Sequence, residues 1–310
     1  MDKILYFAPF HGITTRCFRE VFFTHFSGID VALTPFLQAG EDFTLSKARF
    51  KDIFPSNKEN IPLIVQIIGR KKQEMTETVL YLYEKEYERI NWNIACPMPQ
   101  ITRKKRGCGL MLYPDEIEQV VESICKKTTA KFSVKMRLGM YNSEESLEII
   151  NRLNNYPLDF IAIHARLGMQ VYSGNTNKDA FFQCFRHSKN QLCYNGDIFS
   201  VNDYEKIRNQ LPDLKLFMLG RGLLKNPFLA EQIQGKYISD EEQKNRFMNF
   251  YENLTNVYFD IFPKRNVLNR LKELWRYFAV FCKLSDAQIL SLLQITDCEK
   301  FLEETKKQIV

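Results

Sequence analysis

One cysteine stands where it could take part in chemistry. Residues 90–94 form a short apolar segment typical of a buried strand, and Cys96-Pro97 follows it almost at once. After Cys96 comes a run of four cations, Arg103, Lys104, Lys105 and Arg106. A second cysteine, Cys108, follows this run and has a glycine on each side. A thiol can donate a proton, and a cationic loop attracts a polyanion. The combination predicts a site that handles a polyanionic substrate.

Other polar or glycine-rich groups follow further apolar segments in the same way. They are Gln66, Lys135, Arg137, His164, Arg166, the turn Asn195-Gly196-Asp197 and the turn Gly220-Arg221-Gly222. Taken singly, Lys135, Gln66 and His164 are as consistent with hydrogen-bonded groups inside a fold as with functional ones. Cys96 alone would more often be a small buried apolar residue. Their joint occurrence at successive strand ends predicts a site.

The elements that must position these groups alternate regularly. Strand-like segments recur at 4–8, 30–34, 62–67, 90–94, 131–136, 159–163, 191–195 and 215–219, and most precede a helix-like segment such as 115–126, 144–153 or 201–209. This alternation predicts an α/β fold of the (β/α)8 TIM-barrel type, whose chemistry lies at the carboxyl ends of its strands. No strand-like run follows residue 235, and 240–262, 265–281 and 286–307 read as amphipathic helices. We therefore expect a catalytic barrel over 1–238 and a small all-α helical-bundle domain over 239–310.

The last two strand ends favour a phosphate. The loops after the seventh and eighth strands of many barrels bind phosphate through backbone N–H groups that glycine leaves accessible. Asn195-Gly196-Asp197 and Gly220-Arg221-Gly222 occupy these two places. The position of these two turns in the barrel predicts a phosphate-bearing cofactor. The chain has no GxGxxG sequence, so a Rossmann dinucleotide site is not expected.

Length and composition limit the number of domains and the class of protein. The chain has 310 residues and a net charge of +6, so one large domain with a small companion fits its length. Eight cysteines are scattered without a CxxC pair, and the N-terminus leads directly into a strand, so we expect free thiols, no signal peptide and a cytoplasmic protein. No apolar run is long enough to span a bilayer, the histidines show no metal-ligand spacing, and we expect a monomer.

At these residues the chain resembles the tRNA-dihydrouridine synthase family, flavoproteins with an FMN-binding barrel and a C-terminal helical domain. The resemblance covers nearly the whole chain, and its segments occur in order: Ala8-Pro9 with 14–19, Asn93-x-x-Cys96-Pro97, Val134-Lys135-x-Arg137, Ile163-His164-x-Arg166, Gln170-x-Tyr172-x-Gly174, Asn195-Gly196-Asp197-Ile198, and 220–222 before Asn226-Pro227. The chain departs from the family's usual pattern at Phe10, Ala95, Ala165 and Leu167. None of these changes removes a polar group that the chemistry uses.

The resemblance implies a reaction and a cofactor. The reaction is reduction of the C5–C6 double bond of a uridine in tRNA, with hydride from reduced FMN, NADPH as electron donor and Cys96 as general acid. Lys135 would stabilise negative charge on the flavin, and Asn93 and Arg166 would hold the substrate. The implied FMN contacts are Pro9, Phe10, His11, Gln66, Lys135, His164, Asn195, Gly196, Asp197, Gly220 and Arg221.

The charge pattern adds phosphate contacts for the RNA. Beside Arg103–Arg106, a second basic stripe lies between residues 264 and 283, where Glu273 is the one acidic residue. An extruded nucleotide in folded RNA needs such contacts, because phosphate neutralisation supplies most of the affinity for a nucleic acid. From this stripe we expect contacts by Lys264, Arg265, Arg270 and Lys272.

Other readings stay open at this point. An FMN barrel could reduce a small free pyrimidine, or the substrate could be ribosomal RNA instead of tRNA. A lysine on a barrel strand, Lys135, also suits a Schiff-base aldolase. A non-catalytic RNA-binding protein on a degenerate barrel is disfavoured by the intact set of Cys96, Lys135 and Asn195-Gly196-Asp197. The sequence does not specify the target uridine, the choice between NADPH and NADH, or the division of roles between His164 and Arg166.

Overall fold

The computed structural model describes residues 3–40, 50, 52–53 and 61–309. Eight parallel strands form a closed barrel, because β1 pairs with β9 on one side and with β2 on the other, and β2 pairs with β4. The strands are β1 (Ile4–Phe7), β2 (Val31–Leu33), β4 (Leu63–Ile68), β5 (Arg89–Ile94), β6 (Lys131–Arg137), β7 (Ile161–His164), β8 (Leu192–Asn195) and β9 (Leu216–Leu219). All eight predicted strands are confirmed. A two-residue strand, β3 (Leu37–Gln38), pairs with β4 and was not predicted.

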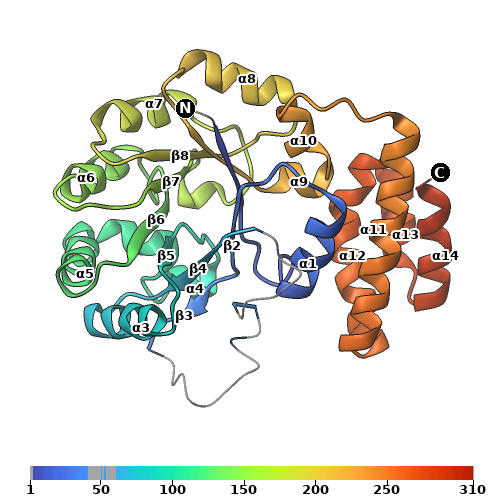
Figure 1. Cartoon of the computed structure of the whole chain (residues 1–310), viewed down its shortest axis with the longest axis horizontal. Coiled ribbons are helices and arrows are strands. Elements are labelled where there is room, and N and C mark those ends of the chain that lie inside the picture. The colour runs from blue at the N-terminus through green and yellow to red at the C-terminus, as the bar shows by residue number, and fades with distance from the viewer. Residues whose placement is uncertain (1–2, 41–49, 51, 54–60, 310) are drawn as a thin grey trace.

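Helices surround this barrel (Figure 1). They are α1 (Arg16–His25), α3 (Lys72–Glu84), α4 (Pro99–Thr102), α5 (Pro114–Lys127), α6 (Glu144–Leu153), α7 (Lys178–His187), α8 (Val201–Gln210), α9 (Arg221–Lys225) and α10 (Leu229–Ile233), with 3-10 turns η1 (Gly107–Leu112) and η2 (Gly168–Gln170). Each long helix turns an apolar stripe inward, as Ile117, Val121 and Ile124 of α5 do. The TIM-barrel prediction is therefore confirmed.

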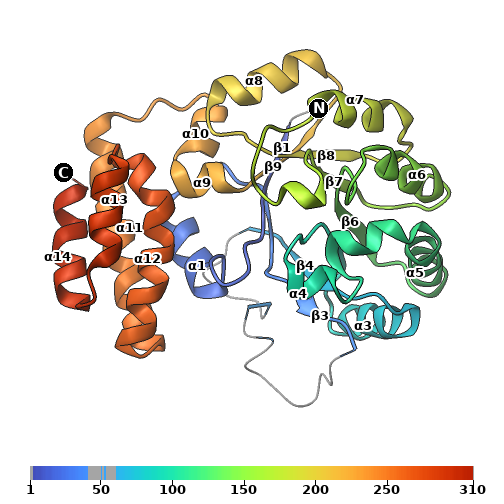
Figure 2. The same ribbon diagram turned by 180° about the vertical axis from the view of Figure 1, so that it is seen from behind.

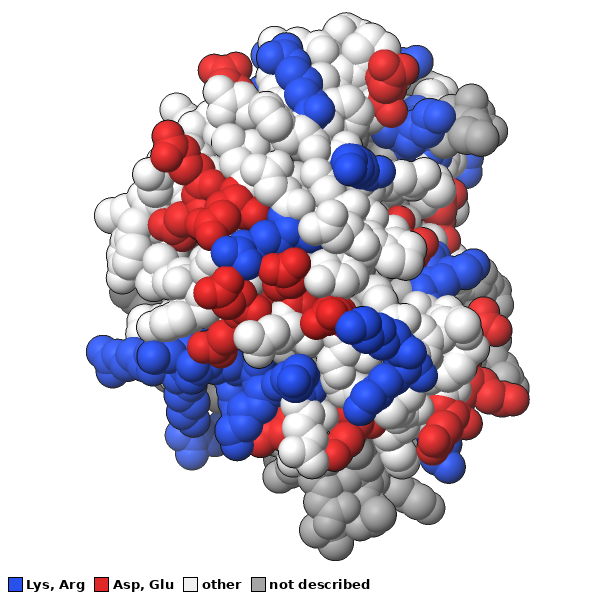
Figure 3. All heavy atoms as spheres, turned by 90° about the vertical axis from the view of Figure 1, so that its left-hand side faces the viewer, with Lys and Arg blue, Asp and Glu red and all other residues white. Residues whose placement is uncertain are grey.

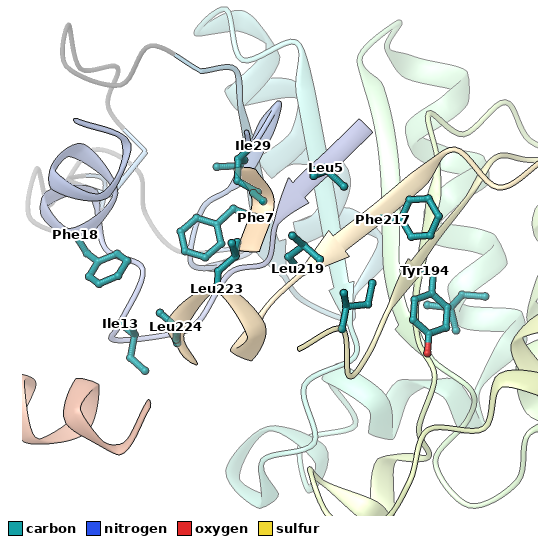
Figure 4. Close-up of a cluster of buried hydrophobic side chains, with 14 of the residues drawn as sticks. Leu5, Phe7, Ile13, Phe18, Ile29, Tyr194, Phe217, Leu219, Leu223 and Leu224 are labelled. Carbon is teal, nitrogen blue, oxygen red and sulfur yellow. The ribbon is translucent and has the colours of Figure 1, made fainter. Parts of the chain in front are cut away.

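Alternation along the strands separates two apolar clusters. Leu5 and Phe7 of β1 point outward and pack with Leu219 of β9 and Phe18 of α1 in the layer between strands and helices (Figure 4). Tyr6 and the other strand residues that point inward fill the barrel interior and form the second cluster. Nearer the carboxyl ends the inward positions become polar, with Gln66, Asn93, Lys135, His164 and Asn195. Side chains alternate between the two faces of each strand, and this alternation places these polar groups inside the barrel near the carboxyl ends of the strands.

Four helices follow the barrel: α11 (Asp240–Ile261), α12 (Lys264–Phe281), α13 (Asp286–Gln294) and α14 (Cys298–Gln308). They pack beside α1 and α9, where α11 meets α1 and α12 meets α9 (Figures 1 and 2). The prediction of one helix over 286–307 was wrong. Asp297 caps a new helix by accepting a hydrogen bond from the Lys300 amide at 2.8 Å, so the helix is interrupted between α13 and α14. Among the described residues, no helix has the length and apolar character needed to cross a membrane.

Candidate active site

Two adjoining cavities open at the carboxyl ends of the strands. We call the first the glycine-side cavity; it measures about 500 Å³ with its open mouth and is bordered by Gly196, Gly220 and Arg221. The second, the cysteine-side cavity, measures about 1070 Å³ with its open mouth and is bordered by Cys96 and Asn93. Residues that line both cavities are Pro9, Phe10, Lys135, His164 and Tyr172. The two cavities therefore share one wall.

Lys135 lies at the junction of the two cavities. Its Nζ donates a hydrogen bond to Asn195 Oδ1 at 2.9 Å, and Asn195 Nδ2 donates in turn to the Met218 carbonyl at 2.9 Å. Burial, together with the nearby Arg137, lowers the pKa of Lys135 to about 8. The ammonium group is thus fixed in place and poorly solvated, which strengthens its interaction with any anion that enters.

A buried amide network orients the loop that carries the cysteine. Asn93 Oδ1 accepts hydrogen bonds from the backbone amides of Ala95 and Cys96, each at 3.0 Å. Asn93 Nδ2 donates to Gln66 Oε1 at 2.8 Å, and Gln66 Nε2 donates to Asn91 Oδ1 at 2.8 Å. Asn93, expected to bind substrate, therefore also positions Cys96 and keeps a single N–H for a ligand. No role was predicted for Asn91, although its spacing of two from Asn93 places both side chains on the inner face of the barrel.

Cys96 is half-buried and lines the cysteine-side cavity. Its carbonyl accepts a hydrogen bond from the Cys108 amide at 3.0 Å. The intervening turn requires glycine, because Gly107 has φ +55° and a Cβ there would lie 2.3 Å from the Cys96 oxygen. Burial raises the pKa of the Cys96 thiol, opposed by the Met98 backbone and by Arg137 and Lys135, so the thiol keeps its proton at neutral pH.

Cys108, which the sequence left ambiguous, lies outside both cavities. Its side chain is fully buried, with Sγ 3.6 Å from Met140 Sδ. Burial raises the pKa of Cys108 to about 11, as expected for a packed thiol. Its proximity to the site comes from the backbone contact with Cys96.

Two arginines share one carboxylate at the glycine-side cavity. Asp197 accepts hydrogen bonds from both terminal nitrogens of Arg166, with Nη1 at 2.9 Å, and from Arg221 Nη2 at 2.7 Å. Arg166 is 2% exposed and also donates to the Gly174 carbonyl at 2.7 Å. The pKa of the neighbouring His164 lies well below its ordinary value because of burial and the surrounding cations, so the imidazole is neutral. The cluster keeps a net positive charge, which suits a phosphate.

Several residues that line the site were not given a role from the sequence. Arg137 donates to three backbone carbonyls, those of Ala95, Leu167 and Val171, at 2.6–3.0 Å. The Tyr172 ring lies 4.9 Å from the Arg221 guanidinium and 5.6 Å from that of Arg137. Tyr172 does belong to one of the family-like segments, so a signal was present. Phe36 and Glu273 also line the cysteine-side cavity, and no local pattern marks them. Tyr277 lines it too, and its position among the cations of residues 264–283 was a sequence signal for stacking on a base.

The predicted basic loop is exposed in most of its length. Arg103, Lys104 and Lys105 are exposed after α4, whereas Arg106 is half-buried. Lys105 Nζ lies 4.6 Å from the Tyr113 ring centre. Figure 3 shows Lys and Arg side chains gathering at the lower left of the face that carries α3, α5 and α6.

The second basic stripe does not form one face of α12. Lys264 pairs with Glu299 of α14 at 2.6 Å. Arg270 donates to the Gly12 carbonyl at 3.0 Å, and its guanidinium lies 4.1 Å from the Phe262 ring. In the described part of the chain, only Arg265 and Lys272 of the four make no ion pair or side-chain hydrogen bond. Arg265 and Lys272, seven residues apart, lie on the same side of α12, whereas Arg270 lies on a different side.

Solved structures with the same architecture include a morphinone reductase and the old yellow enzyme from Trypanosoma cruzi. The first has a TM-score of 0.52 and 8% identity, with 74% of this chain and 86% of that chain covered. The second has a TM-score of 0.53 and 9% identity, with coverage of 81% and 93%. Fold and site together define the class as a (β/α)8-barrel enzyme with its site at the carboxyl face of the strands.

Sequence relatives narrow that class. A probable tRNA-dihydrouridine synthase of Staphylococcus aureus is 23% identical, with 97% of this chain and 93% of that protein covered. A tRNA-dihydrouridine(16) synthase of Aquipseudomonas alcaligenes is 24% identical with 76% of each covered, and a tRNA-dihydrouridine synthase B of Pasteurella multocida is 26% identical with 73% and 67% covered. The family model for dihydrouridine synthase matches residues 6–304. The chain belongs to the dihydrouridine synthase family, and the resemblance noted from its sequence is confirmed.

Proposed function

We propose that this protein reduces a uridine of tRNA to 5,6-dihydrouridine, with FMN as bound cofactor and NADPH as electron donor. The observation that carries the proposal is the shared site of two groups. The Cys96 thiol, which keeps its proton, and the Lys135 ammonium line one cavity, and this cavity adjoins a pocket bordered by Arg221. A proton donor, a fixed cation and an anion pocket in one site suit hydride addition followed by protonation.

The residues present fit FMN. A Cβ on Gly220 would lie 3.3 Å from the Phe10 ring, and Gly196, at φ +142°, would place one 2.9 Å from the Thr176 methyl, so both turns stay bare and leave room for a ligand. Arg221, which borders the glycine-side cavity, would hold the phosphate, and Arg166 would add positive charge from behind Asp197. Bound FMN supplies the hydride that adds to C6 of the uracil ring. The proposed contacts remain Pro9, Phe10, His11, Gln66, Lys135, His164, Asn195, Gly196, Asp197, Gly220 and Arg221, of which His11 and Gln66 line the cysteine-side cavity alone.

Each protein group then has a task. Cys96 donates its proton to C5 from the face of the ring opposite the hydride, and burial keeps that proton in place until the base arrives. Lys135 compensates the negative charge that develops beside it, held in position by Asn195. Asn93 keeps the Cys96 loop in register and offers its remaining N–H to the edge of the base. NADPH would bind only transiently, in the space that the substrate base occupies afterwards.

The RNA needs more surface than the cavity provides. Extruding a base from folded RNA costs roughly a few kcal/mol, and backbone contacts must offset that cost. We assign these contacts to Arg103, Lys104, Lys105 and Arg106, and on α12 to Arg265 and Lys272, which have no protein ion pair in the described chain. Lys264 and Arg270 already have protein partners and contribute less. Residues 239–310 would then act as the RNA-binding domain beside a barrel of residues 1–238.

One experiment separates this function from the small-pyrimidine alternative. Purified protein would be incubated with FMN, NADPH and either unmodified tRNA transcript, ribosomal RNA or free uridine, and dihydrouridine would be measured by mass spectrometry. We expect product on tRNA. Product on free uridine alone would support the small-molecule barrel, and product on ribosomal RNA alone would shift the substrate class.

A further inference from the structure

One acidic side chain faces the substrate side of an otherwise cationic or neutral cavity. Among the described residues that line the cysteine-side cavity, Glu273 is the only carboxylate, and Lys135 and Arg137 line the same cavity. Its carboxylate makes no hydrogen bond or ion pair with residues 3–40, 50, 52–53 or 61–309. A carboxylate beside a bound polyanion is repelled by phosphates unless the ligand offers it a hydrogen-bond donor.

The position of Glu273 at the cavity is set by its helix, α12, which contacts the barrel on both sides of this residue. Arg270, three residues earlier on α12, donates to the Gly12 carbonyl in the loop after β1. Tyr277, four residues later, also lines the cavity, with its ring 6.5 Å from that of Phe10. Residues spaced by three and four lie on one helix face, so this face of α12 forms a wall of the cavity.

Depth in the cavity indicates which part of a nucleoside meets Glu273. Gln66, Asn93 and Lys135 are buried at the floor, whereas Glu273 and His11 are exposed at the rim. An extruded nucleotide enters base first, since its backbone continues outside. The base therefore occupies the floor near Cys96, and the ribose lies at the rim. A ribose in RNA carries one free hydroxyl donor, at the 2′ position.

We propose that Glu273 accepts a hydrogen bond from the ribose 2′-hydroxyl of the extruded uridine, and so makes the site selective for RNA over a 2′-modified or deoxy strand. The inference rests on the proposed function and adds a specificity residue that the cysteine chemistry does not require. A hydrogen bond to a charged acceptor discriminates by roughly 10-fold or more against a partner that lacks the donor.

The test compares two tRNA transcripts, one natural and one with 2′-fluoro in place of every uridine 2′-hydroxyl. Fluorine retains the RNA sugar pucker but has no proton to donate. Initial rates of dihydrouridine formation at low RNA concentration give kcat/KM for each transcript with wild type, Glu273→Ala, Glu273→Gln and, as a matched control on the same helix, Arg276→Gln. Flavin content of each variant shows that the barrel is intact. Because the same two transcripts serve every protein, any effect of fluorine on RNA folding cancels in the ratio.

We expect the wild type and Arg276→Gln to prefer the hydroxyl transcript by about 10-fold or more, Glu273→Ala to lose most of that preference, and Glu273→Gln, which still offers an acceptor, to lie between. Equal discrimination by wild type and Glu273→Ala would overturn the inference, as would the absence of any preference in the wild type. Failure of the wild type on both transcripts would overturn the proposed function itself, and with it this inference.

Discussion

The Lys135 ammonium and the Asn195 carboxamide meet across the barrel interior, at 2.9 Å, although their strands β6 and β8 are separated by β7. Only inward-pointing side chains at the same level of a closed barrel can make such a contact. The contact places a cation between the cysteine-side and glycine-side cavities. It therefore links the residue that would interact with the reacting end of the cofactor to the turn that would hold its phosphate.

Removing the Cys96 thiol should stop protonation without affecting the cofactor. We expect Cys96→Ala to lower the single-turnover rate of dihydrouridine formation by about 10²–10⁴, the usual contribution of a general acid. Reduction of the bound flavin by NADPH, followed by its absorbance, should stay at the wild-type rate. Cys108→Ala is the matched control, because Cys108 lies outside both cavities, and it should keep full turnover. Wild-type product formation by Cys96→Ala would remove the cysteine from the mechanism.

Lys135 should give cofactor binding a characteristic pH dependence. Burial lowers the pKa of Lys135 to about 8, so the free protein has the cation below that pH and loses it as the pH rises through that value. FMN affinity of the apoprotein, measured by fluorescence quenching, should accordingly fall between about pH 7.5 and 9. Lys135→Gln should bind FMN weakly, with little change over the same range. A flat profile in the wild type would show that Lys135 does not interact with the cofactor.

Asp197 should matter for stability as well as for binding. Asp197→Ala leaves the buried Arg166 without its carboxylate, which we expect to reduce the free energy of unfolding by roughly 2–3 kcal/mol, since Asp197 itself is partly exposed. Urea unfolding measures this loss. Inorganic phosphate should stabilise the variant more than the wild type, because it returns a negative charge to the two arginines. If phosphate has no greater effect on the variant, the arginines do not form an anion site.

The basic loop should control the salt dependence of RNA binding. Neutralising Arg103, Lys104 and Lys105 to Gln should reduce the slope of log affinity against log salt by roughly 2, about 0.7 for each lost phosphate contact. The control removes the same charge elsewhere, at Lys300, Lys306 and Lys307 on α14, of which the last two pair with glutamates. Filter binding of tRNA at several salt concentrations gives both slopes. Equal slopes for the two triple variants would place the RNA on another surface.

The sequence predicted the barrel well because each strand is a short buried run. Residues 144–153, expected as a helix, are α6 to the residue, since its apolar positions recur at helical spacing. Residues 286–307 were misread because apolar spacing continues across 295–297, whereas the cap formed by Asp297 is a local hydrogen bond that starts a second helix.

The site was only partly predictable for a similar reason. Cys96, Lys135 and Asn195 stand at strand ends, where position along the chain implies position in the barrel. Glu273 and Tyr277 reach the cavity from α12, through the packing of that helix against α9 and the contact of Arg270 with Gly12. The contact of Arg270 with Gly12 joins residues 258 positions apart, and no local pattern encodes it.

The central claim is reduction of a tRNA uridine with Cys96 as the acid. Its most direct test is a map of dihydrouridine in the tRNA and ribosomal RNA of cells that lack the gene, complemented by wild type or by Cys96→Ala. The account predicts loss of dihydrouridine at a defined tRNA position, restored by the wild type and not by the variant. A map that is unchanged when the gene is removed, or restored equally by Cys96→Ala, would contradict it.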